Sequence, residues 1–490
     1  MPASPPRGFQ AIEREESAPQ HRAKPVIQAT CFVQRQHTRH LNLTGTGVGL
    51  AEEEPGNSSK GAIASDFGRI EFPSSVRAPA KWLRTGSSTE EVVVAGLVKI
   101  MMKDWRLPAP SVIISVTGGA DTLEVNDKQK LVFRRGLLGA AKRASAAGRG
   151  SQERAEEDAE LPMAPWIFTG GTNAGVMELV GRTMLGIDAD VTPGIPCIGI
   201  APYGIISQRK AFTHNPLSHR ALAAADGHGG ASAHQASKKR ARLGTRYVYG
   251  SRPDDPTADA HELIDLESHH SNFLLVDDGT VGSAAFGSEI PLRTALTDYI
   301  CNSCFGVDED GDPLPKPPFV LLVVGGGANT FQMVLDTLVK ARPVVCLPDC
   351  GGAALAIFQF VHYGFEGTDL DNLDPAVHET ARKLLPQIKR HGEVEVGANK
   401  EPQLTFFSTD IDVLASNDLA ATILSAVLSD CDKTVDAINL AVRWRDTAII
   451  RAQLDESQEV DAGGISKAFQ NALLGRDAEV VTTPRPSGST

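Results

Sequence analysis

An α/β fold with a parallel, doubly wound sheet is expected for this chain of 490 residues, on three grounds. Short and nearly continuous apolar runs recur along the chain, as a sheet covered on both faces requires. Stretches with the apolar spacing of helices separate these runs, which is typical of parallel strands joined by crossover helices. Several runs end in glycines, and the chain is rich in glycine (46 residues) and poor in aromatic residues (6%), which suits many tight turns.

The apolar runs place the elements of this fold. Strands are expected at 111–116, 166–168, 197–200, 273–276, 319–324 and 344–347, after a helix at about 89–105. Apolar residues fall on one helical face after the second strand (Val176, Leu179, Val180, Met184) and after the fifth (Phe331, Val334, Leu335, Leu338). Three later helical stretches, near 375–390, 410–429 and 433–455, contain no glycine-rich strand ends.

Composition divides the chain into four parts. Residues 1–70 are polar and broken by Pro and Gly, which predicts a disordered lead with at most a short strand near Cys31. The sheet domain is expected at 71–374, with flexible inserts at 148–160 and 217–245. A small helical segment follows at 375–479, and 480–490 is a disordered tail. We interpret the basic run Lys238–Arg242 as part of a solvated loop.

Charge and hydropathy exclude several classes of protein. The net charge of −12 argues against a nucleic-acid-binding surface. The longest apolar runs have about six residues, far from the roughly 20 needed to span a bilayer, so no transmembrane segment is expected. The first residues lack the apolar core of a secretory signal. Seven scattered cysteines, an odd number, favour reduced thiols in a cytosolic protein over a disulfide framework.

The sequence does not favour a zinc site or a Ser-His-Asp catalytic triad. Cys301, Cys304, Cys346 and Cys350 have a spacing that zinc could use, but reduced thiols on a helix end and a strand are the better interpretation. The pair His269–His270 precedes a strand and is interpreted as turn packing. No Ser-His-Asp arrangement stands out.

Three glycine loops at predicted strand ends carry the functional hypothesis. They are Ser115–Gly119, Thr169–Gly175 and Gly325–Thr330. Ligands of open α/β sheets bind outside the carboxyl ends of the strands, where glycines allow close backbone approach and helix N-termini favour anions. One such loop reflects tight strand–helix packing at least as often, but three at successive strand ends favour a phosphate or nucleotide site. No loop reads G-x-x-x-x-G-K-[ST] or a clean G-x-G-x-x-G, which disfavours a Walker-type triphosphatase and a plain NAD dehydrogenase.

Two arginines and a tyrosine near these loops also suit a nucleotide ligand. Arg209 and Arg293 could each hold a pyrophosphate with forked hydrogen bonds, or could each be an ordinary surface arginine. Tyr203 could stack on a base or simply pack. Asp277 and Asp278 could accept from ribose hydroxyls, or could cap their own turn.

The chain also resembles a known family. The segments Ile114–Ala120 (ISVTGGA), Trp166–Met177 (WIFTGGTNAGVM), His270–Thr280 (HSNFLLVDDGT) and Glu289–Arg293 (EIPLR) are similar to the cytosolic N-terminal region of melastatin-type transient receptor potential (TRPM) cation channels. Further similar segments are Phe133–Leu137, Ile198–Gly204 and Leu440–Trp444, so that the resemblance covers about residues 75–455 in order. Channel subunits of this family continue into further helical repeats and membrane spans, whereas this sequence ends after the first repeat helices.

The resemblance implies a Rossmann-like fold of the SLOG superfamily (LSDAT type), which binds ADP-ribose in some TRPM members. It implies a nucleotide-sensing cytosolic module that regulates a calcium-permeable channel, with no required cofactor, a tetrameric assembly, and a place at the plasma membrane in a channel or in the cytosol otherwise. Carried over by position, the ligand-binding residues are Thr117, Gly118, Gly119, Thr169, Gly170, Gly171, Thr172, Gly175, Tyr203, Arg209, Asp278, Arg293, Gly325, Gly326, Gly327 and Thr330.

An enzyme and an assembly module are the alternatives. Related phosphoribohydrolases of the superfamily carry two glutamates in the loop that corresponds to 325–333, and a carboxylate there assists cleavage of the glycosidic bond. This chain has Gln332 and Met333 at those positions, which predicts binding without turnover. A carboxylate from another part of the chain, such as Glu178 or Glu289, could take the catalytic role, so a hydrolase remains an alternative. A third possibility is a module that serves only in channel assembly.

Overall fold

A computed structural model describes most of the chain between Asp66 and Ile450. The described ranges are 66–75, 77–120, 123, 125–146, 163–185, 194–209, 212, 245–249, 263–306, 313–396, 401–409, 418–431, 434–444 and 450. The predicted strand near Cys31, the insert 148–160, nearly all of the insert 217–245, the run Lys238–Arg242 and the predicted tail lie outside the described residues.

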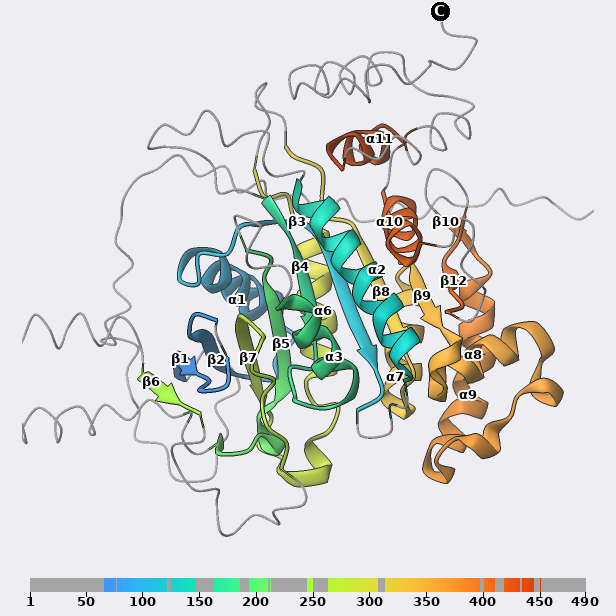
Figure 1. Cartoon of the computed structure of the whole chain (residues 1–490), viewed down its shortest axis with the longest axis horizontal. Coiled ribbons are helices and arrows are strands. Elements are labelled where there is room, and N and C mark those ends of the chain that lie inside the picture. The colour runs from blue at the N-terminus through green and yellow to red at the C-terminus, as the bar shows by residue number, and fades with distance from the viewer. Residues whose placement is uncertain are drawn as a thin grey trace, which may run out of the picture.

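A single sheet of ten strands forms the centre of the molecule (Figure 1). In spatial order these are β12 (Leu404–Phe406), β9 (Val344–Leu347), β8 (Phe319–Val324), β3 (Ala109–Gly118), β4 (Met163–Thr169), β5 (Cys197–Pro202), β7 (Asn272–Asp277), β2 (Ala80–Gly86), β1 (Asp66–Glu71) and β6 (Thr245–Val248). All neighbours run parallel except β1 and β2. The predicted doubly wound α/β fold is therefore confirmed.

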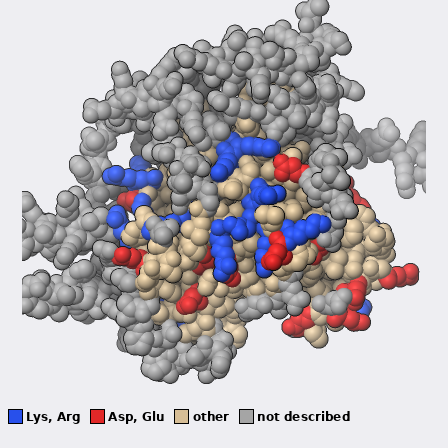
Figure 2. Space-filling model, in the orientation of Figure 1, with Lys and Arg blue, Asp and Glu red and all other residues tan. Residues whose placement is uncertain are grey.

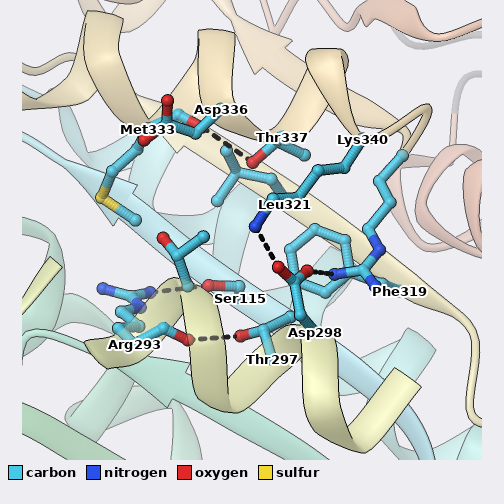
Figure 3. Close-up of a pocket in the computed structure, with 12 residues that line it drawn as sticks. Ser115, Arg293, Thr297, Asp298, Phe319, Leu321, Met333, Asp336, Thr337 and Lys340 are labelled. Carbon is cyan, nitrogen blue, oxygen red and sulfur yellow. Dashed lines mark hydrogen bonds and ion pairs between the residues drawn. The ribbon is translucent and has the colours of Figure 1, made fainter. Parts of the chain in front are cut away.

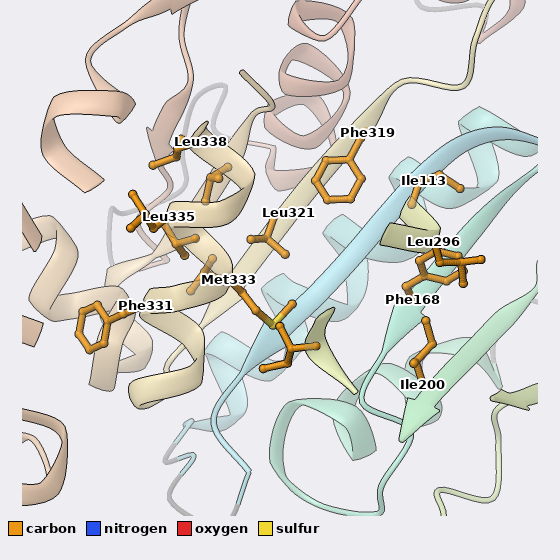
Figure 4. Packing of buried hydrophobic residues seen from close by; sticks show 14 of the residues in the cluster. Ile113, Phe168, Ile200, Leu296, Phe319, Leu321, Phe331, Met333, Leu335 and Leu338 are labelled. Atoms are coloured by element: carbon orange, nitrogen blue, oxygen red, sulfur yellow. The ribbon is translucent and has the colours of Figure 1, made fainter. Parts of the chain in front are cut away.

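Helices cover both faces of the sheet, because the strand side chains alternate between two apolar layers. In β8, Val320, Leu322 and Val324 belong to one layer, and Phe319, Leu321 and Val323 to the other. The first layer holds α2 (Asp127–Ala146), α3 (Gly175–Met184), α10 (Leu419–Ser429) and α11 (Thr434–Arg443). The second holds α1 (Glu91–Lys103), α6 (Ile290–Cys301), α7 (Ala328–Val339), α8 (Gly352–Tyr363) and α9 (Pro375–Gly392), and Figure 4 shows part of its packing.

The order of the strands reverses between β3 and β8. From β3 the chain builds β4, β5 and β7 in one direction, and it then returns to β3 to build β8, β9 and β12 in the other. Such a switch point leaves a crevice at the carboxyl ends of the two central strands, where open α/β sheets bind ligands. The glycine loops that follow β3 and β8 flank this point.

The predicted strands of the sheet are present, and the described elements run across two of the predicted domain boundaries. Each of the six expected strands is found, and 319–324 and 344–347 match to the residue. β1 begins at Asp66, within the expected lead 1–70. The segment after 375 is not a separate helical unit among the described residues, because β12 pairs with β9 and α10 packs against α2. A strand of three residues carries too short an apolar run for sequence patterns to reveal it.

Candidate functional site

The three predicted glycine loops meet at the switch point, held together by backbone hydrogen bonds. Gly118 lies opposite Val324 in the ladder of β3 and β8, and the amide of Gly119 donates to the carbonyl of Val324 over 2.9 Å. The carbonyl of Gly119 accepts from the amide of Val176 in α3, also over 2.9 Å. Gly175 has φ +47°, and a Cβ there would lie 2.1 Å from the Gly119 oxygen. Only glycine fits this position.

A fourth loop, which sequence analysis did not include, braces the loop after β8. The amides of Ala353 and Ala354, at the start of α8, donate to the carbonyls of Gly326 (2.8 Å) and Gly325 (3.2 Å). The signal was present in the sequence, because Gly351 and Gly352 follow the strand 344–347 in the same manner as the other glycines follow theirs.

The loop after β8 keeps its own amides available. The backbone N–H groups of Gly326, Gly327, Ala328 and Asn329 donate to no other residue that the structure describes. They precede and open α7, so the positive end of the helix dipole adds to them. Clustered unpaired amides at the start of a helix bind anions. Thr330 packs its side chain against Gly326 and is itself buried.

Arg293 lies beneath the loops after β3 and β4, and it is only 4% exposed. Its Nη2 donates to Ser115 Oγ (2.7 Å) and to the carbonyls of Val116 (2.9 Å) and Phe168 (3.2 Å). Its Nε has no hydrogen-bond partner among the described residues. Burial lowers the pKa of Arg293 to about 10, against the attraction of Glu289, so the guanidinium is charged at neutral pH. A buried cation with an unpaired donor is suited to an anionic ligand.

Figure 3 shows a groove that runs from Arg293 between α6 and α7. At its far end Asp298 accepts from Arg342 over 2.5 Å and also from Lys340. The lining residues are Ser115, Arg293, Thr294, Thr297, Asp298, Phe319, Leu321, Met333, Asp336, Thr337, Lys340 and Arg342.

The side chains of Met333 and Gln332 both make contacts within the protein. The hydroxyl of Thr117 donates to the sulfur of Met333 over 3.3 Å, and both side chains are buried. Gln332 points to the surface and donates to Asp336 over 2.8 Å. Neither side chain can act as a general base, and Thr117 is engaged within the protein.

Thr169 belongs to a buried network that sequence analysis did not foresee. Its Oγ1 accepts from the amide of Gly171 (2.9 Å) and lies 2.6 Å from Nε2 of His270. Nδ1 of His270 lies 2.7 Å from Glu267, whose other oxygen meets His269 at 2.5 Å. The His270 and Glu267 side chains are 0% and 1% exposed. The interpretation of His269–His270 as turn packing therefore misses their role as an ion-paired brace of the loop after β4.

The pKa values of this network follow from its charges. Burial alone would lower the pKa of His270, but Cys197 and Glu267 beside it raise that pKa to about 10. Burial would raise the pKa of Glu267, but hydrogen bonds and charge from His270 and His269 hold it below its usual value. Both members are therefore charged at neutral pH, and the pair fixes the loop that leads into α3.

Tyr203 and Arg209 form part of a second cluster. The Tyr203 hydroxyl donates to the Arg209 carbonyl (2.8 Å), and the Arg84 guanidinium lies over the Tyr203 ring at 4.6 Å. Arg84, which sequence analysis missed, also pairs with Asp66 (3.1 Å) and Asp277 (3.0 Å). Tyr203 and Arg209 follow β5, Asp277 ends β7 and Arg84 lies in β2, so the cluster is three to five strands from β8.

The remaining predicted residues lie in these loops with local roles. Asp278 is exposed and accepts from the amide and hydroxyl of Thr280, which is the turn role left open above. Thr172 is buried in a bridge to Leu266, and Gly170 follows Thr169. Six cysteines are free thiols, and no cluster suited to a metal occurs among the residues described. Within those residues, no helix has the length and apolar character needed to cross a bilayer.

Comparison with known proteins identifies the relatives of this chain. The family described as SLOG in TRPM matches residues 80–147, 158–233 and 236–399. A TRPM member-like 2 channel of Nematostella vectensis is 27% identical over 92% of this chain and 26% of its own length. TRPM member 2 of Rattus norvegicus is 30% identical over 60% of this chain and 16% of its own. TRPM member 6 of Homo sapiens is 28% identical over 93% and 20%.

The chain thus spans about a sixth to a quarter of the length of these relatives. The family match covers every strand of the sheet except β1 and β12, all of the predicted glycine loops and α6 to α9. This chain belongs to the family of SLOG domains found in TRPM channels.

Proposed function

We propose that this chain is a nucleotide-sensing module of a TRPM-type cation channel. The observation that carries the proposal is the row of four amides, Gly326 to Asn329, that find no acceptor among the described residues at the switch point of the sheet. Arg293, buried below the neighbouring loops with an unpaired Nε, supports the same ligand chemistry. Together they favour a phosphate or diphosphate group.

The position of the second cluster favours a ligand longer than a phosphate. Strands are spaced by about 4.8 Å, so Tyr203 after β5 lies about 14 Å across the sheet from the loop after β8. A nucleoside diphosphate such as ADP-ribose could place a phosphate at one end and a ring at the other. Gln332 and Met333 supply no carboxylate, so the proposed ligand is bound without hydrolysis.

The channel context of the relatives gives the module its setting. In a channel it would lie at the cytosolic face of the plasma membrane as part of a tetramer, and ligand binding would alter gating and calcium transport. An assembly module without ligand remains the second candidate, since the amides after β3 and much of the loop after β4 are already paired inside the fold.

A single backbone amide offers a sharp test. Ala328 is the first residue of α7, where proline is tolerated, so Ala328→Pro removes one N–H while preserving the helix. Glu91→Pro, at the first residue of α1, is the matched control. Thermal unfolding is measured with ADP-ribose, AMP, NAD and inorganic phosphate. A ligand at 100 times its Kd stabilises by about 2.7 kcal/mol.

We expect a nucleotide to stabilise the wild type and the Glu91→Pro variant, and to stabilise Ala328→Pro much less. If no nucleotide stabilises the wild-type chain, the sensing proposal is wrong and the assembly role is favoured. Cleavage of ADP-ribose or AMP that is lost in Arg293→Ala would instead establish an enzyme.

A further inference from the structure

The outer face of α2 is a basic stripe. Phe133, Leu137 and Ala141 of this helix face the sheet, and Lys128, Leu131, Arg135 and Lys142 lie on the opposite side at helical spacing. Arg134 flanks them. Leu131 is 47% exposed in the middle of these cations. We call Lys128, Leu131, Arg134, Arg135 and Lys142 the basic stripe.

Figure 2 shows a gathering of Lys and Arg over this part of the molecule. Ion pairs neutralise the neighbours of the stripe: Lys130 pairs with Asp127 (3.7 Å), Arg143 with Asp418 (3.4 Å) and Arg182 with Glu178 (2.5 Å). No ion pair is found for the stripe residues themselves among the described residues. A concentration of unneutralised cations on a chain of net charge −12 calls for an anionic partner.

A complementary surface lies on the same chain, between the end of α8 and the start of α9. Residues 363–379 contain five exposed acidic residues and no Lys or Arg. The acidic residues are Glu366, Asp369, Asp371, Asp374 and Glu379. Two aromatic rings stand among these acids, Tyr363 (63% exposed) and Phe365 (46% exposed). We call residues 363–379 the acidic turn.

We propose that the basic stripe of one chain binds the acidic turn of a second copy. The charges are opposite, and each surface has an exposed apolar centre, Leu131 on one and Tyr363 with Phe365 on the other. The two surfaces lie on different elements, so the contact is between unlike patches, and a symmetric assembly would use each patch once per chain. This contact does not depend on ligand binding at the switch point.

The contact should be weak and sensitive to salt. The 20 residues of α2 make a helix about 30 Å long, which offers less than the roughly 800 Å² per partner of a standard interface. Its attraction is largely electrostatic, and charges are screened beyond about 8 Å at 0.15 M ionic strength. Self-association is therefore measured at low ionic strength and high protein concentration.

Charge reversal on each side provides the test, with the full chain throughout. One variant is K128E/R135E, and the other is E366K/D371K. We expect the wild type to self-associate in sedimentation equilibrium, and each variant alone to associate at least tenfold more weakly. An equimolar mixture of the two variants should associate again, because each reversed surface then meets its complement. The matched control K99E/K103E, on exposed lysines of α1, should behave as the wild type.

If something other than a second copy of the chain binds the basic stripe, the same experiments give different results. A wild-type chain that stays monomeric at low salt overturns the proposal, as does a mixture that fails to associate. If K128E/R135E lowers the melting temperature but leaves self-association unchanged, the stripe serves an acidic stretch of its own chain, such as 153–160, and the proposal is wrong. Wild-type association that is abolished by nuclease treatment also overturns it. Circular dichroism verifies that each variant is folded.

Discussion

The loops after β4 and β8 have similar sequences, yet the fold uses their backbone amides differently. In the loop after β4 the amides of Gly171 and Asn173 donate to Thr169 and to the carbonyl of Asp265, and Thr169 is held in turn by the buried His270 and Glu267. The loop after β8 is fastened through its carbonyls, which accept from the start of α8, so its amides are left over. Glycine-rich strand ends therefore share a sequence pattern without leaving the same backbone groups unpaired. What distinguishes the two loops is whether their amides find an acceptor among the described residues.

The largest effect should come from the side-chain brace. Glu267→Ala removes the carboxylate that pairs with the buried His270, so the imidazole must either stay charged without a partner or lose its proton, and removing one partner of a buried ion pair costs about 3–5 kcal/mol. Glu178→Ala, in an exposed pair with Arg182, should change stability by less than about 0.5 kcal/mol. Urea unfolding measures both. Equal losses in the two variants would show that the loop after β4 is not held by this brace.

The dependence of stability on pH should sharpen the comparison. The folded pKa of His270 is raised to about 10, above its unfolded value of 6.5. The protonated His270 therefore contributes fully to the free energy of unfolding below pH 6.5. This contribution is lost as the pH rises toward 10, by up to about 1.4 kcal/mol per pH unit. In His270→Gln this fall should disappear from the unfolding curves measured between pH 6.5 and 10. A fall of the same slope in both proteins would assign it to other groups.

The smallest of these effects should come from the backbone brace. Gly352 has φ +55°, where alanine costs about 1–2 kcal/mol. A Cβ there would also lie 2.5 Å from the Gly326 carbonyl oxygen. At Gly279, which has φ +87°, a Cβ meets nothing within 4 Å, so Gly279→Ala is the control. We expect Gly352→Ala to melt lower than Gly279→Ala, and equal melting temperatures would mean that the loop after β8 adjusts to the added methyl group without loss of stability.

Much of the architecture was readable from sequence, and the reasons are physical. Fully buried parallel strands must be apolar along their whole length, which is why β8 and β9 were placed to the residue. β2 was not predicted from the sequence because Lys81 and Arg84 interrupt its apolar run. Partners across the fold do not appear in a local pattern, so neither the contact of Thr169 with His270 nor that of Arg84 with Tyr203 could be foreseen.

The ligand-binding roles predicted for the loops stay predictions, with one refinement. Sequence patterns placed Gly325 to Thr330 at a strand end and before a helix, where the structure has them. They could not show that the Thr117 and Thr169 hydroxyls are engaged by Met333 and His270. These bonds depend on residues more than 100 positions away.

The pairing of β12 with β9 affects how this protein can be cut into pieces. A fragment that stopped at Asp374 would lose α9, whose Ala381, Leu385 and Ile388 are wholly buried. It would also leave β9 as a bare sheet edge, open to pairing with other chains. Recombinant versions for binding or crystallisation work should therefore extend through α10 at least, so that both apolar layers keep their covering helices.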